Sequence, residues 1–331
     1  MPAPETPLAQ RDAPDSAVVI GDEWKVAVPT VLLAQGLLEV VLRMLSIARP
    51  AVDLPFQFEG TMMTPLGTVV RMIPPLGVFE LVIHGLLLIV ACAFVHRLTR
   101  LDHVPGAASR AAWLVALSPL GVLIMADLVF ALTFVISAGA LLSARRGFML
   151  SAGVAAATAA LLSPFAGLVW IGILYEFFRL KMWRGANAAS AVGLLLPAVI
   201  VVGWAVKVAG AAQAPVIEAL MTVITGRGTW GPIWMPAELT GVVTLVTAAL
   251  IGVASLIAIV EGRRLRKSYL IVTFAFVTAG LLGGSSTSTL HALALAFPLA
   301  TMLGVETYHR PMFERPLVAG CALASLCLYL M

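Results

Sequence analysis

The sequence predicts an all-helical, polytopic membrane protein, and three observations predict it. Of its 331 residues, 60% are hydrophobic and only 11% are charged, with a mean hydropathy of +1.01, whereas soluble domains carry about 25% charged residues. Apolar runs of about 17 to 25 residues recur along the chain, the length that a helix needs to cross a bilayer core. Basic residues gather between alternate runs, which predicts an orientation for the bundle.

The apolar runs and the residues that break them define the expected elements. Residues 1–24 are rich in proline, alanine and acidic residues and predict a flexible polar tail, whereas residues 25–331 form a single transmembrane domain. Breaks at Pro119, Pro164 and Gly283–Gly284 are expected to produce half-helices or tilted segments. About eleven spans are expected, several of them short, at 27–48, 75–95, 111–125, 127–144, 148–163, 165–178, 190–211, 238–260, 269–284, 289–305 and 316–331.

The distribution of basic residues places the amino terminus in the cytoplasm. With this orientation sixteen Lys and Arg residues fall on the cytoplasmic side, and only Arg49, Arg71 and Arg227 fall in outer loops. The two large outer loops are then 49–74 and 212–237. Topology alone accounts for the net charge of +4, so no nucleic-acid partner is expected. The cytoplasmic loops "SARRGF", "FRLKMWR" and "EGRRLRK" predict contact with anionic lipid head groups, and the small-residue stretch "SAGVAAATAA" (151–160) predicts close packing on a neighbouring helix.

Five ionisable residues within the expected spans are singled out, and all five lie in the outer half of the membrane or near its middle. Such groups are costly in lipid and usually face the bundle interior or a cavity. Two pairs have i,i+4 spacing and so share a helix face, and they leave two readings open: buried pairs that hold helices together, or a polar cavity that opens outward. The five residues are Glu39 with Arg43, Glu80 with His84, and Lys207.

Further polar residues are expected at the outer face. Asp127 begins the span 127–144, where a helix N-terminus favours a negative charge, and this local role competes with a place in the outward cavity. His291, in "SSTSTLHALA", and Arg227, in the second outer loop, are also expected outside.

The segment "EGTMMTPLGTVVRMIPPLG" follows the first expected span, and "LSPLGVLIMADLVFALTFVISAGALLSARRG" combines a Pro-containing short span, an outer acid and a following helix. Both resemble segments of the GT-C superfamily of membrane glycosyltransferases that use polyprenyl-phosphate sugars, and the first is similar to a run in its GPI-mannosyltransferase branch. "FMLSAGVAAATAALLSPFAGLVWIGILYEFF" resembles its small-residue helix broken by proline, and "HALALAFPLATMLGV" resembles a late span. The four segments are spread over most of the length of the chain, between Glu59 and Val305.

The resemblance implies transfer of a sugar, mannose in that branch, from a polyprenyl-phosphate donor at the extracytoplasmic face of a bacterial inner membrane. Asp53 would accept the proton of the acceptor hydroxyl, Glu59 would be a second acid or a ligand of a divalent cation, and Asp127 matches an acid found in relatives. Cationic side chains would stabilise the leaving lipid phosphate, and the candidates are Arg71, Lys207, Arg227 and His291. The expected partners are membrane lipids, the lipid-linked sugar and other membrane subunits.

Two alternatives stay open. Relatives in that branch often carry paired acids in the first outer loop, whereas here Leu54 and Pro55 follow Asp53, so the chain could be a catalytically silent GT-C-like subunit that binds lipid or scaffolds a complex. A secondary transporter is the second alternative, because half-helices and intramembrane charges also suit transport. No His or Cys cluster has metal-ligand spacing, and no metal site is expected from such residues.

Overall fold

The computed structural model describes residues 22–44, 65–71, 78–185, 188–225, 267–282 and 297–330. These residues are helical throughout apart from short turns, which agrees with the all-helical class expected from the sequence. The first half of the chain contributes α1 (Asp22–Met44), α2 (Pro65–Arg71), α3 (Val78–Arg100), α4 (Pro105–Leu117), α5 (Pro119–Ala126), α6 (Leu128–Arg145) and α7 (Met149–Leu162). The second half contributes η2 (Pro164–Leu168), α8 (Val169–Arg179), η3 (Met182–Gly185), α9 (Ala188–Ala212), α10 (Val216–Thr225), α12 (Lys267–Leu282), α14 (Phe297–His309), η4 (Pro311–Phe313) and α15 (Glu314–Leu330).

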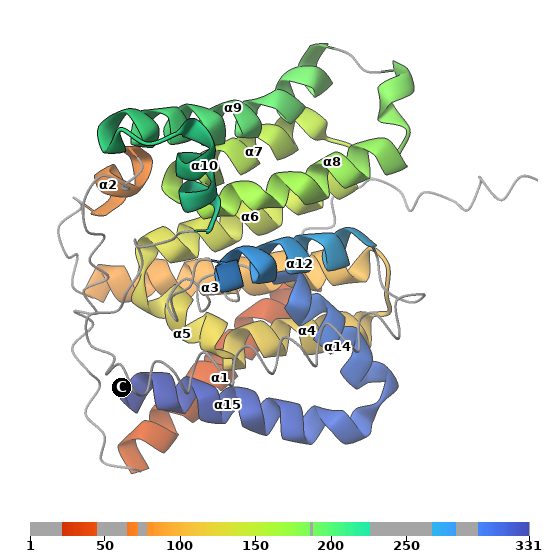
Figure 1. Ribbon diagram of the computed structural model, residues 1–331. Coiled ribbons are helices and arrows are strands. Elements are labelled where there is room, and N and C mark those ends of the chain that lie inside the picture. The colour runs from red at the N-terminus through yellow and green to blue at the C-terminus, as the bar shows by residue number, and fades with distance from the viewer. Residues whose placement is uncertain are drawn as a thin grey trace, which may run out of the picture.

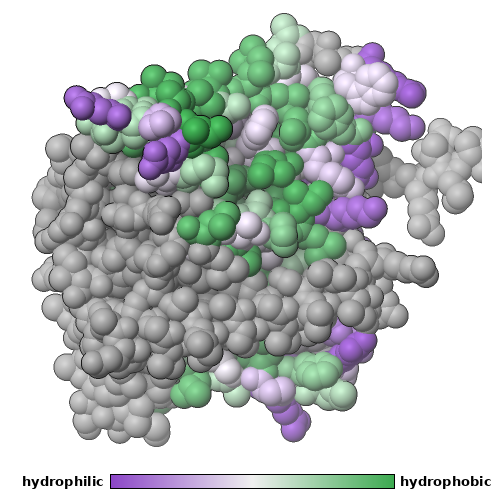
Figure 2. Space-filling view, viewed as in Figure 1, coloured by the Kyte–Doolittle hydropathy of each residue, from purple (hydrophilic) through white to green (hydrophobic). Residues whose placement is uncertain are grey.

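Most of the longer described helices run side by side across the molecule (Figure 1). Within the described residues, three helical segments are long and apolar enough to span a membrane: Leu81–Arg100, Leu128–Arg145 and Ala188–Ala212. The pair α4 and α5 makes a fourth if it is counted as one broken span. Apolar side chains cover the exposed side of α9 between hydrophilic side chains at both ends of the molecule (Figure 2).

One end of the bundle collects the basic residues and is called here the basic end. It comprises the starts of α1, α9 and α12, the turns 101–104, 146–148 and 180–185, and the segment 310–315. Ion pairs join these elements across the end, for example Arg97 with Glu23 and Arg110 with Glu314. This is the end that the charge distribution predicts to be cytoplasmic, and we call the other the opposite end.

Two of the expected breaks are confirmed. A 56° bend separates α4 from α5, because Pro119 cannot donate a backbone hydrogen bond to the preceding turn. Pro164 likewise begins the short 3-10 segment η2 between α7 and α8. The expected break at Gly283–Gly284 lies outside the described residues, as do the expected span 238–260 and the first part of 289–305.

Several expected boundaries are wrong. The span expected at 111–125 begins at Pro105, because proline is well suited to the first helical turn. The helix at the end of the tail, expected as a brief surface helix around Asp22 to Lys25, is instead the start of α1, which continues through Pro29 without a break. The segment 49–74, expected as an outer loop, contains α2. The segment 212–237, also expected as a loop, contains α10, whose Ala219 and Val223 pack on Trp204 and Val208 of α9.

Small residues let the helices approach closely, as the stretch 151–160 predicts. Pro197 has no N–H to donate to the carbonyl of Gly193 one turn earlier. Gly153 of α7 faces that carbonyl so closely that an added Cβ would overlap it, and a Cβ added at Gly193 would lie 2.8 Å from the Cα of Leu150. Backbone contact of this kind is typical of small-residue interfaces in membrane helices, so the prediction of close packing is confirmed.

Two alanine substitutions on α9 test this packing. Gly193→Ala should lower the free energy of unfolding by about 1 to 3 kcal/mol, because an overpacked backbone has to shift. Gly203→Ala, where a Cβ would meet nothing within 4 Å, should be neutral or stabilising by up to about 1 kcal/mol, because alanine favours the helix. Reversible unfolding in detergent measures both, and equal effects would contradict the packing described here.

Candidate functional site

Two of the predicted site residues come together at the break between α5 and α6. Asp127 has an extended backbone between the two helices, and its Oδ1 accepts hydrogen bonds from the N–H groups of Val129 (2.8 Å) and Phe130 (3.2 Å). The buried Nδ1 of His84 on α3 lies 2.6 Å from the carbonyl oxygen of Ile124, near the end of α5. Asp127 therefore caps the start of α6, while His84 satisfies a carbonyl at the end of α5.

This arrangement has a clear physical reason. A helix end leaves N–H and C=O groups without intrahelical partners, and in an apolar bundle side chains have to bind the groups that water does not reach. The extended backbone of Asp127 (φ −133°, ψ 116°) separates α5 from α6, so both helix ends at this break have groups that side chains can bind. Both residues were singled out as functional candidates, and in the structure both stabilise the backbone of the break.

Lys207 is the other predicted site residue whose side chain is described. It is exposed on α9 near the opposite end, with its Nζ 4.5 Å from the centroid of the Trp204 ring. Its helix packs on α7, α8, α10 and η2 rather than on α5, so Lys207 belongs to a different part of the molecule from His84 and Asp127.

For the remaining candidates, either the side chain or the whole residue lies outside the part of the chain that the structure describes. The backbones of Glu39, Arg43, Arg71 and Glu80 are helical, in α1, α2 and α3, but their side chains are outside the described part. Four further candidates fall outside the described residues altogether: Asp53, Glu59, Arg227 and His291.

The most extensive described polar cluster lies elsewhere, at the basic end, and centres on Arg145 at the end of α6. The Arg145 side chain is 3% exposed. Its two terminal nitrogens each lie 2.7 Å from one carboxylate oxygen of Asp102, which is located in the turn between α3 and α4. Its Nη1 also donates to the hydroxyl of Tyr269 on α12 at 2.6 Å. This two-point contact is the strongest geometry that an Arg–carboxylate pair can adopt.

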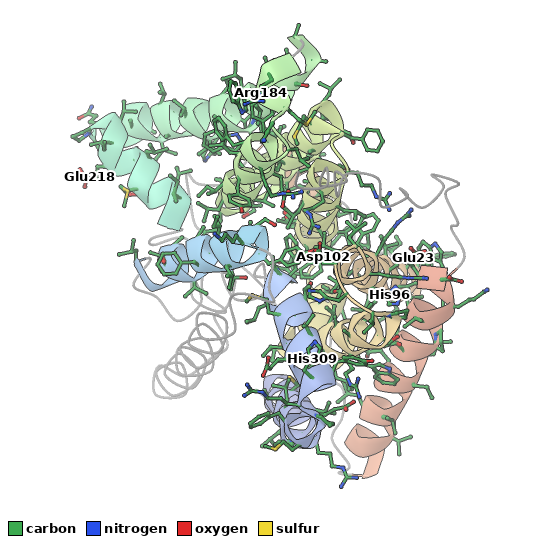
Figure 3. All side chains as sticks on the ribbon, turned by 90° about the vertical axis from the view of Figure 1, so that its right-hand side faces the viewer. Glu23, His96, Asp102, Arg184, Glu218 and His309 are labelled. Carbon is green, nitrogen blue, oxygen red and sulfur yellow. The ribbon has the colours of Figure 1, made fainter. Side chains whose placement is uncertain are left out.

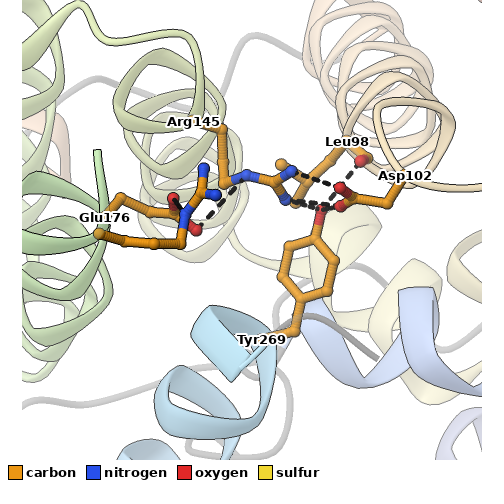
Figure 4. A network of polar contacts seen from close by, with 6 residues as sticks. Leu98, Asp102, Arg145, Glu176 and Tyr269 are labelled. Atoms are coloured by element: carbon orange, nitrogen blue, oxygen red, sulfur yellow. Dashed lines mark hydrogen bonds and ion pairs between the residues drawn. The ribbon is translucent and has the colours of Figure 1, made fainter. Parts of the chain in front are cut away.

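The cluster extends to α8 and is drawn in Figure 4. Glu176 is fully buried, with Oε1 3.4 Å from the Nε of Arg145 and Oε2 2.7 Å from the Nε of Arg179. The Tyr269 hydroxyl donates to the carbonyl oxygen of Leu98 at 2.9 Å. Two carboxylates and two guanidinium groups balance in charge, which is the condition for burying them at all. We call these residues the Arg145 network; it consists of Asp102, Arg145, Glu176, Arg179 and Tyr269.

Further ion pairs surround this network and fasten the neighbouring helix ends. Figure 3 looks onto the basic end, with Glu23 of α1 close to His96 of α3. Arg97 pairs with Glu23 (3.4 Å), and Arg100 pairs with Asp22 (3.1 Å). Hydrogen bonding to Arg100, assisted by the charge of Lys25, keeps the pKa of the Asp22 carboxyl below its ordinary value. Burial lowers the pKa of the His103 imidazole, in the turn after α3.

Our sequence analysis missed the Arg145 network, although one signal for it was present. Arg145 and Arg179 enter the sequence prediction only through the charge distribution that orients the chain, and Asp102 is not among its candidates. Glu176, however, falls within the expected span 165–178, where a carboxylate needs a partner. Its i,i+3 spacing to Arg179 identifies the first partner. Nothing in the sequence connects it to Asp102 or Tyr269, which are 74 and 93 residues away.

The geometry defines a helical protein with membrane-capable spans whose basic end is closed by a buried ionic network. Among the described residues, no group of three or more His, Cys, Asp or Glu side chains is placed to hold a metal ion. No protein family, curated protein or solved structure matches this chain in comparison. The functional assignment therefore has to come from the residues themselves.

Replacing Arg145 tests the network as a source of stability. Arg145→Met should lower the free energy of unfolding by about 3 to 5 kcal/mol, because it leaves the Asp102 and Glu176 carboxylates buried without their shared cation. Tyr269→Phe, which removes one hydroxyl, should cost about 1 to 3 kcal/mol.

Arg146→Met is the matched control for this prediction, because Arg146 is the next residue and is exposed. Its effect should stay within about 0.5 kcal/mol. Denaturant unfolding in the same detergent measures all three variants. Similar losses for Arg145→Met and Arg146→Met would show that only net charge matters at this end.

Proposed function

We propose that this chain is a polytopic membrane protein with a cytoplasmic basic end, and that it transfers a sugar from a polyprenyl-phosphate donor at the outer face. The observation that carries the proposal is the difference between its two ends. The basic end is closed by the buried Arg145 network. Reactions of polar substrates would then take place at the opposite end, where the outer loop 49–74 with Asp53 and Glu59 is expected.

The proposed reaction is a displacement at the anomeric carbon of the donor sugar. The acceptor hydroxyl oxygen forms the new C–O bond while the bond from the anomeric carbon to the phosphate oxygen breaks, and the lipid phosphate leaves with the bonding pair. The Asp53 carboxylate accepts the hydroxyl proton. Positive charge near the departing phosphate lowers the barrier, and the candidates remain Arg71, Lys207, Arg227 and His291. Glu59 would assist as a second acid or bind a divalent cation.

A silent, lipid-binding subunit is a second candidate, and the position of Asp127 favours it. Two backbone N–H groups already occupy Oδ1 of this carboxylate, so one of the three proposed catalytic acids has a structural task. A transporter is less well supported, since it must open toward both faces. Opening the basic end would require separating Arg145 from Asp102 and Glu176 inside the protein.

Sugar transfer by the full-length protein in nanodiscs is the direct test. We expect turnover with one member of a panel of labelled polyprenyl-phosphate sugars, and loss of turnover in Asp53→Asn while donor binding is retained, because the amide cannot take up the proton. Donor binding without turnover in either protein, over a broad acceptor panel, would favour the silent subunit. Absence of donor binding would contradict the proposal.

Substitutions of Asp127 separate a chemical role from a structural one. Asn caps a helix about as well as Asp, whereas Ala loses about 0.5 to 2 kcal/mol of stability. Asp127→Ala should therefore unfold more easily than Asp127→Asn, measured by thermal unfolding in detergent. If Asp127 also serves the reaction, Asp127→Asn should lose turnover while keeping wild-type stability. Wild-type turnover in Asp127→Asn would show that Asp127 caps the helix and takes no part in the reaction.

A further inference from the structure

The cations of the basic end fall into two groups that only the structure separates. Most of those that the structure describes face a carboxylate within 4 Å, and these are Lys25, Arg97, Arg100, Arg110, Arg145, Arg179 and Arg310. Among the described residues, five have no such carboxylate: Arg146, Lys181, Arg184, Lys267 and Arg315. Only the second group has charge left for a ligand.

Two of these uncompensated cations share the turn between α8 and α9. The Lys181 backbone has φ +54°, a conformation that L residues seldom adopt. The N–H of Arg184 donates to the Lys181 carbonyl at 3.1 Å, which closes the turn. The Arg184 guanidinium lies 5.2 Å from the centroid of the Trp183 ring. The turn thus presents two cations beside an aromatic ring.

Apolar side chains on the same turn are also exposed. Phe178 is 57% and Trp183 is 54% exposed. Aromatic rings beside Lys and Arg mark the boundary between head groups and acyl chains, where rings sit at the head-group level and long cationic side chains reach the phosphates. The turn has the composition of a membrane interface on the basic side.

An apolar track begins directly after this turn. Val192, Leu195, Val199, Val202 and Val206 of α9 are all exposed, and their alternating spacing of three and four residues places them on one face of the helix. From Val192 to Val206 this face extends about 21 Å along the helix axis, a length comparable to an acyl chain. Figure 2 shows the apolar cover over α9 reaching toward hydrophilic side chains at the basic end.

We propose that the turn 178–185 and the adjoining face of α9 bind an anionic phospholipid of the leaflet on the basic side. Lys181 and Arg184 contact the head-group phosphate, Trp183 packs at the head-group boundary, and an acyl chain lies along the α9 face. The lipid site requires that the helices span a membrane, but it does not require sugar transfer. The two proposals can therefore be tested independently. The turn 178–185 differs from the loop "SARRGF", where Arg145 is buried and paired with Asp102.

Lipid binding to the purified full-length protein tests the site. Native mass spectrometry would compare retention of phosphatidylglycerol and phosphatidylcholine with identical acyl chains. We expect the wild type to prefer phosphatidylglycerol. Lys181→Gln/Arg184→Gln should weaken that binding about 25-fold at low salt, because each cation near an anionic head group contributes about fivefold. Binding of phosphatidylcholine should change little.

Lys267→Gln/Arg315→Gln is the matched control, since it removes the same charge from the same end. It should change phosphatidylglycerol binding by less than about twofold, and unfolding temperatures should match among all three proteins because these side chains are on the surface. A large excess of inorganic phosphate should not displace the lipid, because the free anion makes no contact with the α9 face.

Three results would overturn the proposal. The first is wild-type retention of phosphatidylglycerol by Lys181→Gln/Arg184→Gln. The second is an equal loss in Lys267→Gln/Arg315→Gln, which would indicate attraction to the overall charge of the basic end. The third is displacement of the lipid by inorganic phosphate, which would identify a simple anion site.

Discussion

The buried guanidinium of Arg145 on α6 makes the contacts that hold the ends of α3, α8 and α12 together. It binds the turn after α3 through Asp102, α8 through Glu176 and α12 through Tyr269. A charge that is removed from water is tolerated only when its partners are in place. Each of these helix ends is therefore fixed relative to α6, and one side chain relates segments that are far apart in the chain.

The two ends of the bundle meet the same requirement by different means. At the basic end, charged side chains satisfy one another. At the break between α5 and α6, the groups that need partners belong to the backbone, so no second charged side chain is required. His84 contacts the carbonyl of Ile124, and Asp127 accepts a hydrogen bond from the N–H of Val129. Close contacts through Gly153 and Gly193 hold α7 and α9 between these ends, where few polar groups are available to direct packing.

Sequence patterns predict the helices of this chain better than their contacts. Long apolar runs predict α3, α6 and α9, and prolines predict two breaks, because both signals are local. The start of α4 was misplaced because Ser109 and Arg110 interrupt its apolar run, although Arg110 is paired with Glu314 of α15. The helix α10 was missed because its ten residues are too few to span a membrane, and its packing on α9 is not visible in sequence.

For the candidate site too, the sequence predicts individual residues better than the contacts between them. His84 and Asp127 could be singled out because an ionisable residue in an apolar run is conspicuous, but the break that brings them together follows from the fold. The Arg145 network was missed because counting basic residues for orientation treats each one as exposed. The structure separates cations that hold helices together from those, such as Lys181 and Arg184, that remain available to lipid.

The distribution of acids bears on the proposed chemistry. The acids of the described basic end, including Asp22, Glu23, Asp102 and Glu176, already have cationic partners. The outer side is expected to carry five carboxylates, those of Asp53, Glu59, Asp127, Glu218 and Glu238, against four cations, Arg49, Arg71, Arg227 and Lys207. An anionic lipid-phosphate donor would then approach an outer surface with excess negative charge. A divalent cation held by Asp53 or Glu59 would offset that repulsion and also stabilise the leaving phosphate, so a dependence of turnover on divalent cations follows from the enzymatic proposal and not from the silent one.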